Sequence, residues 1–155
     1  MKAQSEIIKV TGMPFVAGFN WSVGVLMEKF IKSLADKKLL AAGCPECEYI
    51  HLPPRTRCPK CSAKTSEGNL VEVKGSGTLL SYTLAYVELD GKGNFKDLEK
   101  PGIIAAVKLD EADSTVFMPL EDIEPDKLKQ GLKVSLKWRD ETKGEIADLR
   151  CFCPQ

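Results

Sequence analysis

Cys44-Pro45-Glu46-Cys47 begins the stretch that decides the fold. After ten further residues, the stretch ends with Cys58-Pro59-Lys60-Cys61. Each Cys-x-x-Cys unit places two sulfur atoms on one tight turn, and the gap is long enough for a short hairpin that brings the two turns together. Four converging thiolates form a tetrahedral site that suits zinc or a single iron ion. The spacing therefore predicts a four-cysteine metal site in a ribbon-like segment.

Disulfide bonds within each Cys-x-x-Cys unit are the alternative to a metal. Such bridges are strained across so short a gap and occur mostly in catalytic redox pairs. We favour zinc over iron because rubredoxin-type knuckles usually carry glycine directly after the second cysteine, where Glu48 and Ser62 stand here. Four thiolates leave no open position for water or substrate, so we expect the metal to order a segment too small to fold alone.

Composition limits the remaining classes of protein. With 155 residues, 43% hydrophobic and 28% charged, the chain is long enough for one compact domain and a small appendage. Lysine plus arginine and aspartate plus glutamate number 22 each, so no net charge draws the chain to nucleic acid or an anionic membrane. Six cysteines, four of them in metal spacing, predict a reducing compartment, by default the cytoplasm.

The N-terminal part, residues 1–37, combines an uncharged stretch with a helix. Residues 1–10 lack the pattern of a signal peptide, and residues 10–27 contain no charge. We do not expect a membrane span, because a proline and three glycines interrupt this stretch. We expect an apolar arm that packs on the chain's own core or docks on a partner subunit through Phe15, Phe19 and Trp21. Apolar residues then recur at helical steps over residues 22–37, with Ser22 as the N-cap.

Residues 38–69 are predicted to form the ribbon, with strands at residues 38–42 and 50–52 on either side of the first knuckle. His51, the only histidine, lies in the second of these strands. It is a candidate metal ligand or base, but four thiolates already complete the site. We therefore expect an ordinary residue of the ribbon surface.

Residues 70–155 are predicted to form a five-stranded OB barrel. Apolar and polar residues alternate at Leu80, Tyr82, Leu84 and Tyr86, which predicts a strand with one buried face. A short helix is expected at residues 124–131, where Pro125 and Gly131 mark its ends. A helix between the third and fourth of five strands is the order of an OB fold. The predicted strands are residues 80–86, 103–109, 115–119, 132–139 and 146–152.

Three further features have two interpretations each. The glycines of Gly75-Ser76-Gly77 open onto a strand, which favours a tight bend over a phosphate-binding loop. Residues 89–101 form a loop that binds a ligand or partner, or a solvated hairpin end. Cys151 and Cys153 lie on one face of the last strand, where we favour buried thiols over a second metal or redox site.

The order of these features resembles a known family. The resemblance rests on residues 30–40, on Pro53-Pro54-Arg55 before the second knuckle, and on the run from Val71 through Gly75-Ser76-Gly77-Thr78 to Ser81-Tyr82-Thr83. In these features the chain is similar to the thiolase-associated zinc-ribbon/OB-fold proteins, from about residue 30 to its end. That family was once catalogued only as a domain of unknown function.

The resemblance implies a function. Members of the family accompany thiolase-type enzymes, including acetyl-CoA acetyltransferases and hydroxymethylglutaryl-CoA synthases, as non-catalytic subunits, and a role in binding acyl-CoA has been suggested. It implies that Cys44, Cys47, Cys58 and Cys61 bind one structural zinc, and it assigns no catalytic residue. The residues agree, because acyl transfer in such sites needs a cysteine beside histidines, and this chain has one histidine.

We therefore expect a non-catalytic partner of a thiolase-like chain, with no membrane association. The basic residues Arg55, Arg57, Lys60 and Lys74 either meet coenzyme A phosphates or form a solvated face. The alternative function is a single-stranded nucleic-acid-binding module that stacks bases on Tyr82, Tyr86, Phe95 and Trp138. Zero net charge argues against it. An iron-containing electron carrier is the third and least favoured interpretation.

Overall fold

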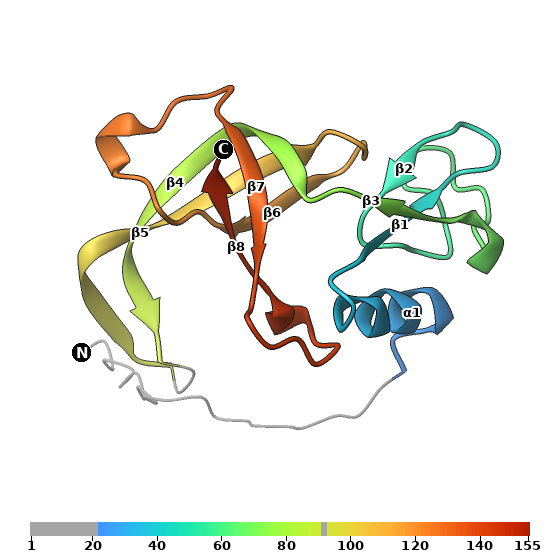
Figure 1. Ribbon diagram of the computed structural model, residues 1–155, viewed down its shortest axis with the longest axis horizontal. Helices are drawn as coiled ribbons and strands as arrows, with labels where there is room; N and C mark the ends of the chain where they lie inside the picture. The colour runs from blue at the N-terminus through green and yellow to red at the C-terminus, as the bar shows by residue number, and fades with distance from the viewer. Residues whose placement is uncertain (1–21, 91–92) are drawn as a thin grey trace, which may run out of the picture.

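The computed structural model describes residues 22–90 and 93–155. A helix and a small ribbon sheet lie to one side of a five-stranded barrel, as Figure 1 shows. The fold is mostly β, with the helix first, the ribbon second and the OB-type barrel last, as predicted. The apolar arm with Phe15, Phe19 and Trp21 lies outside the described residues, so its packing stays a prediction.

Helix α1 (Val25–Leu34) packs on the core through one stripe of side chains. Leu26, Phe30 and Leu34 recur every four residues and are buried, as one face of a helix requires. The predicted N-cap at Ser22 is wrong. Gly24 is the N-cap, and its φ of 80° suits glycine better than any other residue. The Ser22 hydroxyl instead accepts the Gly24 N–H.

The ribbon sheet contains the strands β1 (Leu39–Gly43), β2 (Ile50–His51) and β3 (Leu70–Val73) in the order β2-β1-β3. The pairing of β1 with β2 forms the predicted hairpin around the first knuckle. Strand β3 follows a short 3-10 turn, η1 (Glu67–Asn69), and pairs antiparallel with the other edge of β1. The segment that starts at residue 70 therefore contributes its first strand to the ribbon sheet before it enters the barrel.

The barrel contains five antiparallel strands in the order β6-β5-β4-β7-β8. An isolated parallel bridge between Leu120 and Phe152 joins the two ends of this sheet, and the Glu121 N–H donates to the Phe152 carbonyl at 2.9 Å. This contact closes the sheet into the OB-type barrel. The strands are β4 (Ser76–Leu89), β5 (Phe95–Leu109), β6 (Thr115–Pro119), β7 (Lys133–Trp138) and β8 (Leu149–Pro154).

Two predicted elements of the barrel differ from the structure. The helix expected at residues 124–131 is only a 3-10 turn, η2 (Pro125–Lys127), because the backbone becomes extended again at Leu128. The loop expected at residues 89–101 is mostly strand, since Leu89 pairs with Phe95 and Glu88 with Lys96. Strands β4 and β5 thus form a long hairpin that extends beyond the other strands (Figure 1).

One apolar core runs from α1 through the ribbon sheet into the barrel. Gly77 stands where β4 enters the barrel, and a Cβ there would lie 2.6 Å from the Lys108 carbonyl oxygen. A side chain at this position would thus collide with the neighbouring backbone, which accounts for the glycine. The central barrel side chains are Leu79, Val107, Leu109, Val134 and Phe152, each at most 1% exposed.

The connection between β7 and β8 attaches α1 to the barrel. It contains the 3-10 turn η3 (Ile146–Asp148), and the buried Asp148 carboxylate accepts the backbone N–H groups of Lys143, Gly144 and Glu145. The Thr142 hydroxyl of the same connection donates to the Ala35 carbonyl at the end of α1, at 2.7 Å. The ribbon side and the barrel are thus joined by hydrogen bonds as well as by the shared core.

Candidate metal centre

The four knuckle cysteines converge as the spacing predicts. Their sulfur atoms lie within 4.8 Å of one another, with 3.4 Å from Cys44 to Cys61 and 3.6 Å from Cys47 to Cys58. Zinc–sulfur bonds of about 2.3 Å in a tetrahedron set sulfur–sulfur distances of roughly 3.8 Å. The four side chains therefore fit one metal ion of this kind.

Both knuckles have the same backbone geometry. The Glu48 N–H donates to the Cys44 carbonyl at 3.0 Å, and the Ser62 N–H donates to the Cys58 carbonyl at 2.9 Å. Glu48 has φ of 58° and Ser62 has φ of 63°, so both take the left-handed conformation that usually favours glycine. The lack of glycine at these positions therefore does not change the knuckle backbone, and it does not distinguish zinc from iron.

Backbone N–H groups favour the thiolate at Cys44. Burial raises the pKa of this thiol, but hydrogen bonds from the Cys47 and Glu46 backbone outweigh burial and lower it to about 7. The Lys60 N–H also points at the Cys58 sulfur, at 3.4 Å. A bound metal ion deprotonates coordinating thiols outright, so the polypeptide and the ion favour the same charge state.

The site is suited to a structural metal ion. All four tetrahedral positions are supplied by protein sulfur, which leaves none for water or substrate. Within residues 22–90 and 93–155, this is the one group of three or more metal-ligating side chains close enough to share an ion. The ion would hold the two knuckles together, in a part of the chain with few buried apolar side chains.

His51 is buried, so the prediction that it lies on the ribbon surface is wrong. It is 2% exposed, because β2 turns its side chain under the segment around Arg55 and Thr65. Its Nε2 lies 3.4 Å from the Arg55 carbonyl oxygen, and its Nδ1 has no hydrogen-bond partner in the described part of the chain. Strand β2 has only two residues, which are too few for an alternation of apolar and polar side chains to predict this burial.

The four basic residues predicted to meet phosphate do not gather in one pocket. The Arg57 guanidinium donates to the Ser62 carbonyl at 3.1 Å in the second knuckle, and the Lys60 ammonium lies 6.0 Å above the Tyr49 ring. Arg55 borders a hollow beside the start of α1. Lys74 lies apart from them, on the link between β3 and β4.

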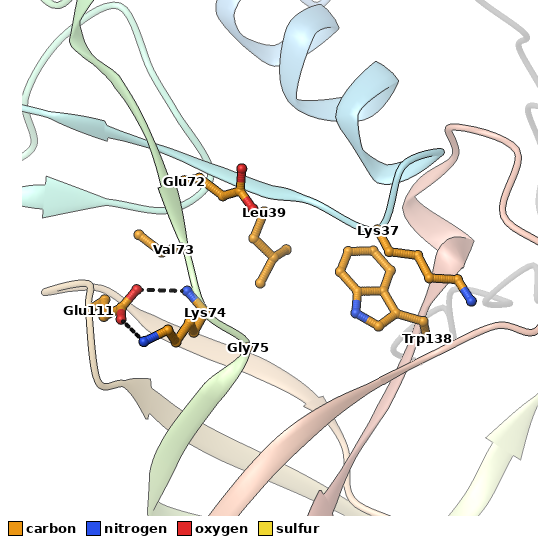
Figure 2. Close-up of a pocket in the computed structure, with 8 residues that line it drawn as sticks. All are labelled: Lys37, Leu39, Glu72, Val73, Lys74, Gly75, Glu111 and Trp138. Carbon is orange, nitrogen blue, oxygen red and sulfur yellow. Dashed lines mark hydrogen bonds and ion pairs between the residues drawn. The ribbon is translucent and has the colours of Figure 1, made fainter.

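Lys74 lines a pocket of about 420 Å³ between the ribbon sheet and the barrel, shown in Figure 2. Its backbone N–H and its ammonium both contact the Glu111 carboxylate, at 2.9 and 3.2 Å, and these hydrogen bonds lower the pKa of Glu111. Lys37 and Trp138 lie side by side on the opposite wall in Figure 2. No sequence motif joins these residues, so sequence reasoning missed the pocket.

Cys151 and Cys153 lie on one side of β8, with their sulfur atoms 3.8 Å apart. Cys151 is buried, as predicted, and burial raises the pKa of its thiol to about 12. Cys153 is half-buried and donates to the Asp122 carboxylate at 3.2 Å. The pair therefore packs at the barrel wall, away from the four-cysteine site.

These features define a zinc-ribbon protein with an OB-type barrel. Two family models match the chain: the rubredoxin-like zinc ribbon domain of ChsH2 over residues 32–67 and the C-terminal OB-fold domain of ChsH2 over residues 70–139. Together they cover more than half of the chain, which belongs to the ChsH2/DUF35 family.

Two curated relatives are DUF35 domain-containing scaffold proteins. The protein from Methanocaldococcus jannaschii is 29% identical over 103 residues, which cover 65% of this chain and 67% of the relative. The protein from Pyrococcus furiosus is 28% identical over 115 residues, which cover 73% and 78%.

Solved structures show the same fold. An Ltp2-ChsH2(DUF35) aldolase chain aligns with a TM-score of 0.63 at 24% identity, covering 87% of this chain and 98% of that one. A DUF35 protein of unknown function from Sulfolobus solfataricus aligns with a TM-score of 0.55 at 28% identity, covering 70% and 75%.

Proposed function

We propose that this chain is a non-catalytic accessory subunit of a thiolase-type acyl-CoA enzyme, of the thiolase or hydroxymethylglutaryl-CoA synthase class. Two relatives are named scaffold proteins, and a structural neighbour forms an aldolase together with Ltp2. A scaffold acts by binding other proteins, so its surface must offer them a contact area. The apolar surface beside α1 has this character.

The observation that carries the proposal is an apolar groove of about 440 Å³ between α1, Pro53 and β6. Met27 and Phe30 form its helical wall, and Phe117 borders it from β6 while 72% exposed. Ile146 on the opposite border is 50% exposed. Apolar side chains gathered in this way on one surface typically mark a protein–protein contact. We infer that a catalytic chain covers this groove.

The interface is proposed to include the N-terminal arm, whose residues Phe15, Phe19 and Trp21 lie outside the described part of the chain. The arm precedes Val23 and Val25, which are 50% and 53% exposed at the start of α1. Val23 lines a hollow that shares Met27 with the groove. The arm and the groove would then meet the same partner.

The chemistry is assigned to the partner. A thiolase-type acyl transfer uses a nucleophilic cysteine beside histidines. Here four thiols converge on the metal site, and the one histidine is buried without a cysteine among its hydrogen-bond partners. The accessory chain would therefore position the catalytic chain or its substrate.

Binding of a CoA ester is a further part of the proposal. Arg55, Arg57 and Lys60 form no ion pair with any described carboxylate, so their charges are available to an anion such as a CoA phosphate. Titration calorimetry with CoA and with dephospho-CoA tests this. Binding that weakens when Arg57→Gln is introduced supports it, and equal affinity of the variant contradicts it.

The proposed assembly is tested by purifying the tagged full chain from its native cells and identifying stoichiometric companions by mass spectrometry. We expect a thiolase-type or synthase-type chain. Triple substitution of Met27, Phe117 and Ile146 by serine should reduce its recovery, whereas Lys127→Ser, on the turn η2 and not part of the groove lining, should not. Recovery of the protein alone would contradict the proposal.

The alternative is a single-strand-binding module, because Tyr82, Tyr86 and Phe95 are exposed on the β4–β5 hairpin. Bases stack on aromatic side chains of this kind. Charges of both signs surround them, so no basic groove accompanies the rings. Oligonucleotide affinity that falls steeply with salt would favour this function over the scaffold.

A further inference from the structure

Among the described residues, the outer edge of strand β4 has no neighbouring strand over its second half. Strand β5 pairs with one side of β4 along its whole length, but β7 pairs with the other side only from Ser76 to Thr78. Two more hydrogen bonds join Leu79 to Gly131 and Leu132. Beyond this point, residues 81–89 have no strand on their outer side within the described part of the chain (Figure 1).

The backbone groups on this edge point away from β5 at regular intervals. Ile103 of β5 faces Leu84, and its carbonyl accepts the Leu120 N–H on the side away from β4. Two facing residues of an antiparallel pair direct their backbone groups either both inward or both outward. The N–H and C=O of Leu84 therefore point outward. Because the direction alternates along a strand, the same groups of Tyr82 also point outward. Tyr86 lies in a register irregularity between Ala85 and Val87, so this alternation does not extend to it.

The composition of residues 81–89 does not protect this edge. The segment reads Ser-Tyr-Thr-Leu-Ala-Tyr-Val-Glu-Leu, with one charge and neither proline nor glycine. Tyr86 is 59% exposed, Leu89 61% and Val87 44%. Native proteins normally protect a free edge with charges, prolines or bulges, because unpaired backbone groups invite another strand.

Strand β5 provides the contrast within the same hairpin. Its outer edge, before the pairing with β6 begins at Ile104, contains Lys96, Lys100 and Pro101. A register irregularity falls in both strands here, since Ala85 pairs with Gly102 but Val87 with Asp97. The outer edge of β5 thus carries several charges and a proline, whereas residues 81–89 of β4 carry one charge and no proline. A two-stranded ribbon is only marginally stable by itself, so the hairpin would gain from a third strand.

We infer that the outer edge of β4, residues 81–89, binds an extended segment of the catalytic partner as an added strand. A row of alternating N–H and C=O groups is matched by another polypeptide backbone, and neither a phosphate nor a base provides that spacing. Glu88 already faces Lys96 across the hairpin, so the added strand needs no basic residue and is mainly apolar. The identity of the partner rests on the proposed function, whereas the addition of a strand does not.

The test compares two substitutions at one exposed position. Tyr82→Pro removes the outward N–H, and Tyr82→Thr removes the ring but keeps the N–H and a strand-favouring side chain. Each tagged full chain is purified from native cells in its zinc-bound state, and companion proteins are quantified. We expect recovery of the partner to fall at least ~10-fold with Tyr82→Pro and by less than about 3-fold with Tyr82→Thr. Unchanged zinc content and circular dichroism show that the fold is kept.

Hydrogen exchange supplies a second measurement. In the complex, the amides of Tyr82 and Leu84 should exchange at least ~100-fold more slowly than in the isolated chain. Thr83 and Ala85 face β5 and should change less. Protection already present in the isolated chain would assign the edge to a segment of this chain, or to a second copy if it depends on concentration. Either result would overturn the inference.

The outcomes separate the two proposals. A thiolase-type partner that is recovered equally with Tyr82→Pro, without protection of β4, overturns strand addition and leaves the accessory-subunit function standing. A different protein that is lost with Tyr82→Pro and protects β4 overturns that function and supports strand addition. Recovery of no companion protein overturns both.

Discussion

The knuckle region, residues 44–65, and the barrel are stabilised in different ways. The knuckle region buries few side chains, among them Leu52, His51 and Thr65, and relies on four converging sulfur atoms. Within the described residues, the barrel has no cluster of three or more metal-ligating side chains. Its interior is filled by aliphatic and aromatic side chains such as Leu79, Val134 and Phe152. The ribbon should therefore respond to metal supply, and the barrel to changes of volume in its core.

The largest expected effect is the loss of metal. Zinc binding to small ribbons contributes on the order of 10 kcal/mol to folding, so a chelator or Cys58→Ser should unfold residues 44–65. Hydrogen exchange should show rapid exchange there and unchanged protection in β5 and β7. Elemental analysis should find one zinc in the wild type. Cys153→Ser is the matched control and should keep its zinc. Unfolding of the barrel by the chelator would remove the distinction between the two regions.

A substitution in the barrel core should destabilise the barrel and leave the metal site intact. Phe152 is 1% exposed beside the contact that closes the barrel, and Phe152→Ala should reduce stability by about 3–5 kcal/mol. Urea denaturation followed by circular dichroism measures this. Phe117→Ala, at 72% exposure, should change stability by no more than about 0.5 kcal/mol. The Phe152 variant should still bind one zinc in the absence of urea. Equal effects of the two alanines would show that Phe152 is not a core residue.

The connection between β7 and β8, which attaches α1 to the barrel, should contribute a stability that depends on pH. Hydrogen bonds from the Glu145, Lys143 and Gly144 backbone outweigh burial and lower the pKa of Asp148. A carboxyl group with a lowered folded pKa stabilises the protein above its unfolded pKa of about 3.9, and this contribution is lost as the pH falls through the folded value. Asp148→Asn should therefore lower the Tm at pH 7 by roughly 5 °C or more.

The same variant should approach the wild type as the pH falls below about 3.9. Urea titrations of both proteins at several pH values measure the difference between their free energies of unfolding. Effects common to both proteins, such as loss of zinc in acid, cancel in this difference. A difference that stays constant with pH would show that the Asp148 charge is not involved.

The smallest effect should come from the knuckle backbone. Glu48 has φ of 58°, and Glu48→Gly should relieve strain at some cost in unfolded-state entropy, for a net gain of about 0.5 kcal/mol. Competition with a chromophoric chelator should show roughly twofold tighter zinc binding. Glu46→Gly, at a position without positive φ, should weaken binding. Weaker binding by both variants would mean that Glu48 is not strained.

The four-cysteine site and the five strands of an OB-type barrel could be predicted from the sequence. Cys44, Cys47, Cys58 and Cys61 all fall within one short stretch, so their spacing alone shows that they can share an ion. Alternation predicted β7 correctly, because one face of that strand packs against the core. The prediction failed where alternation continued without a core beneath it. Tyr82 and Tyr86 were expected on a buried face but are 40% and 59% exposed.

The sequence by itself determined the four-cysteine cluster and the fold class, because these depend on local spacing and on the period of apolar residues. Only the tertiary structure decided the burial of His51, the pocket in which Lys37, Lys74, Glu111 and Trp138 meet, and the free edge of β4. Each of these depends on which distant segments lie next to each other. Exposure and pairing are properties of those long-range contacts, and no residue pattern within one strand specifies them.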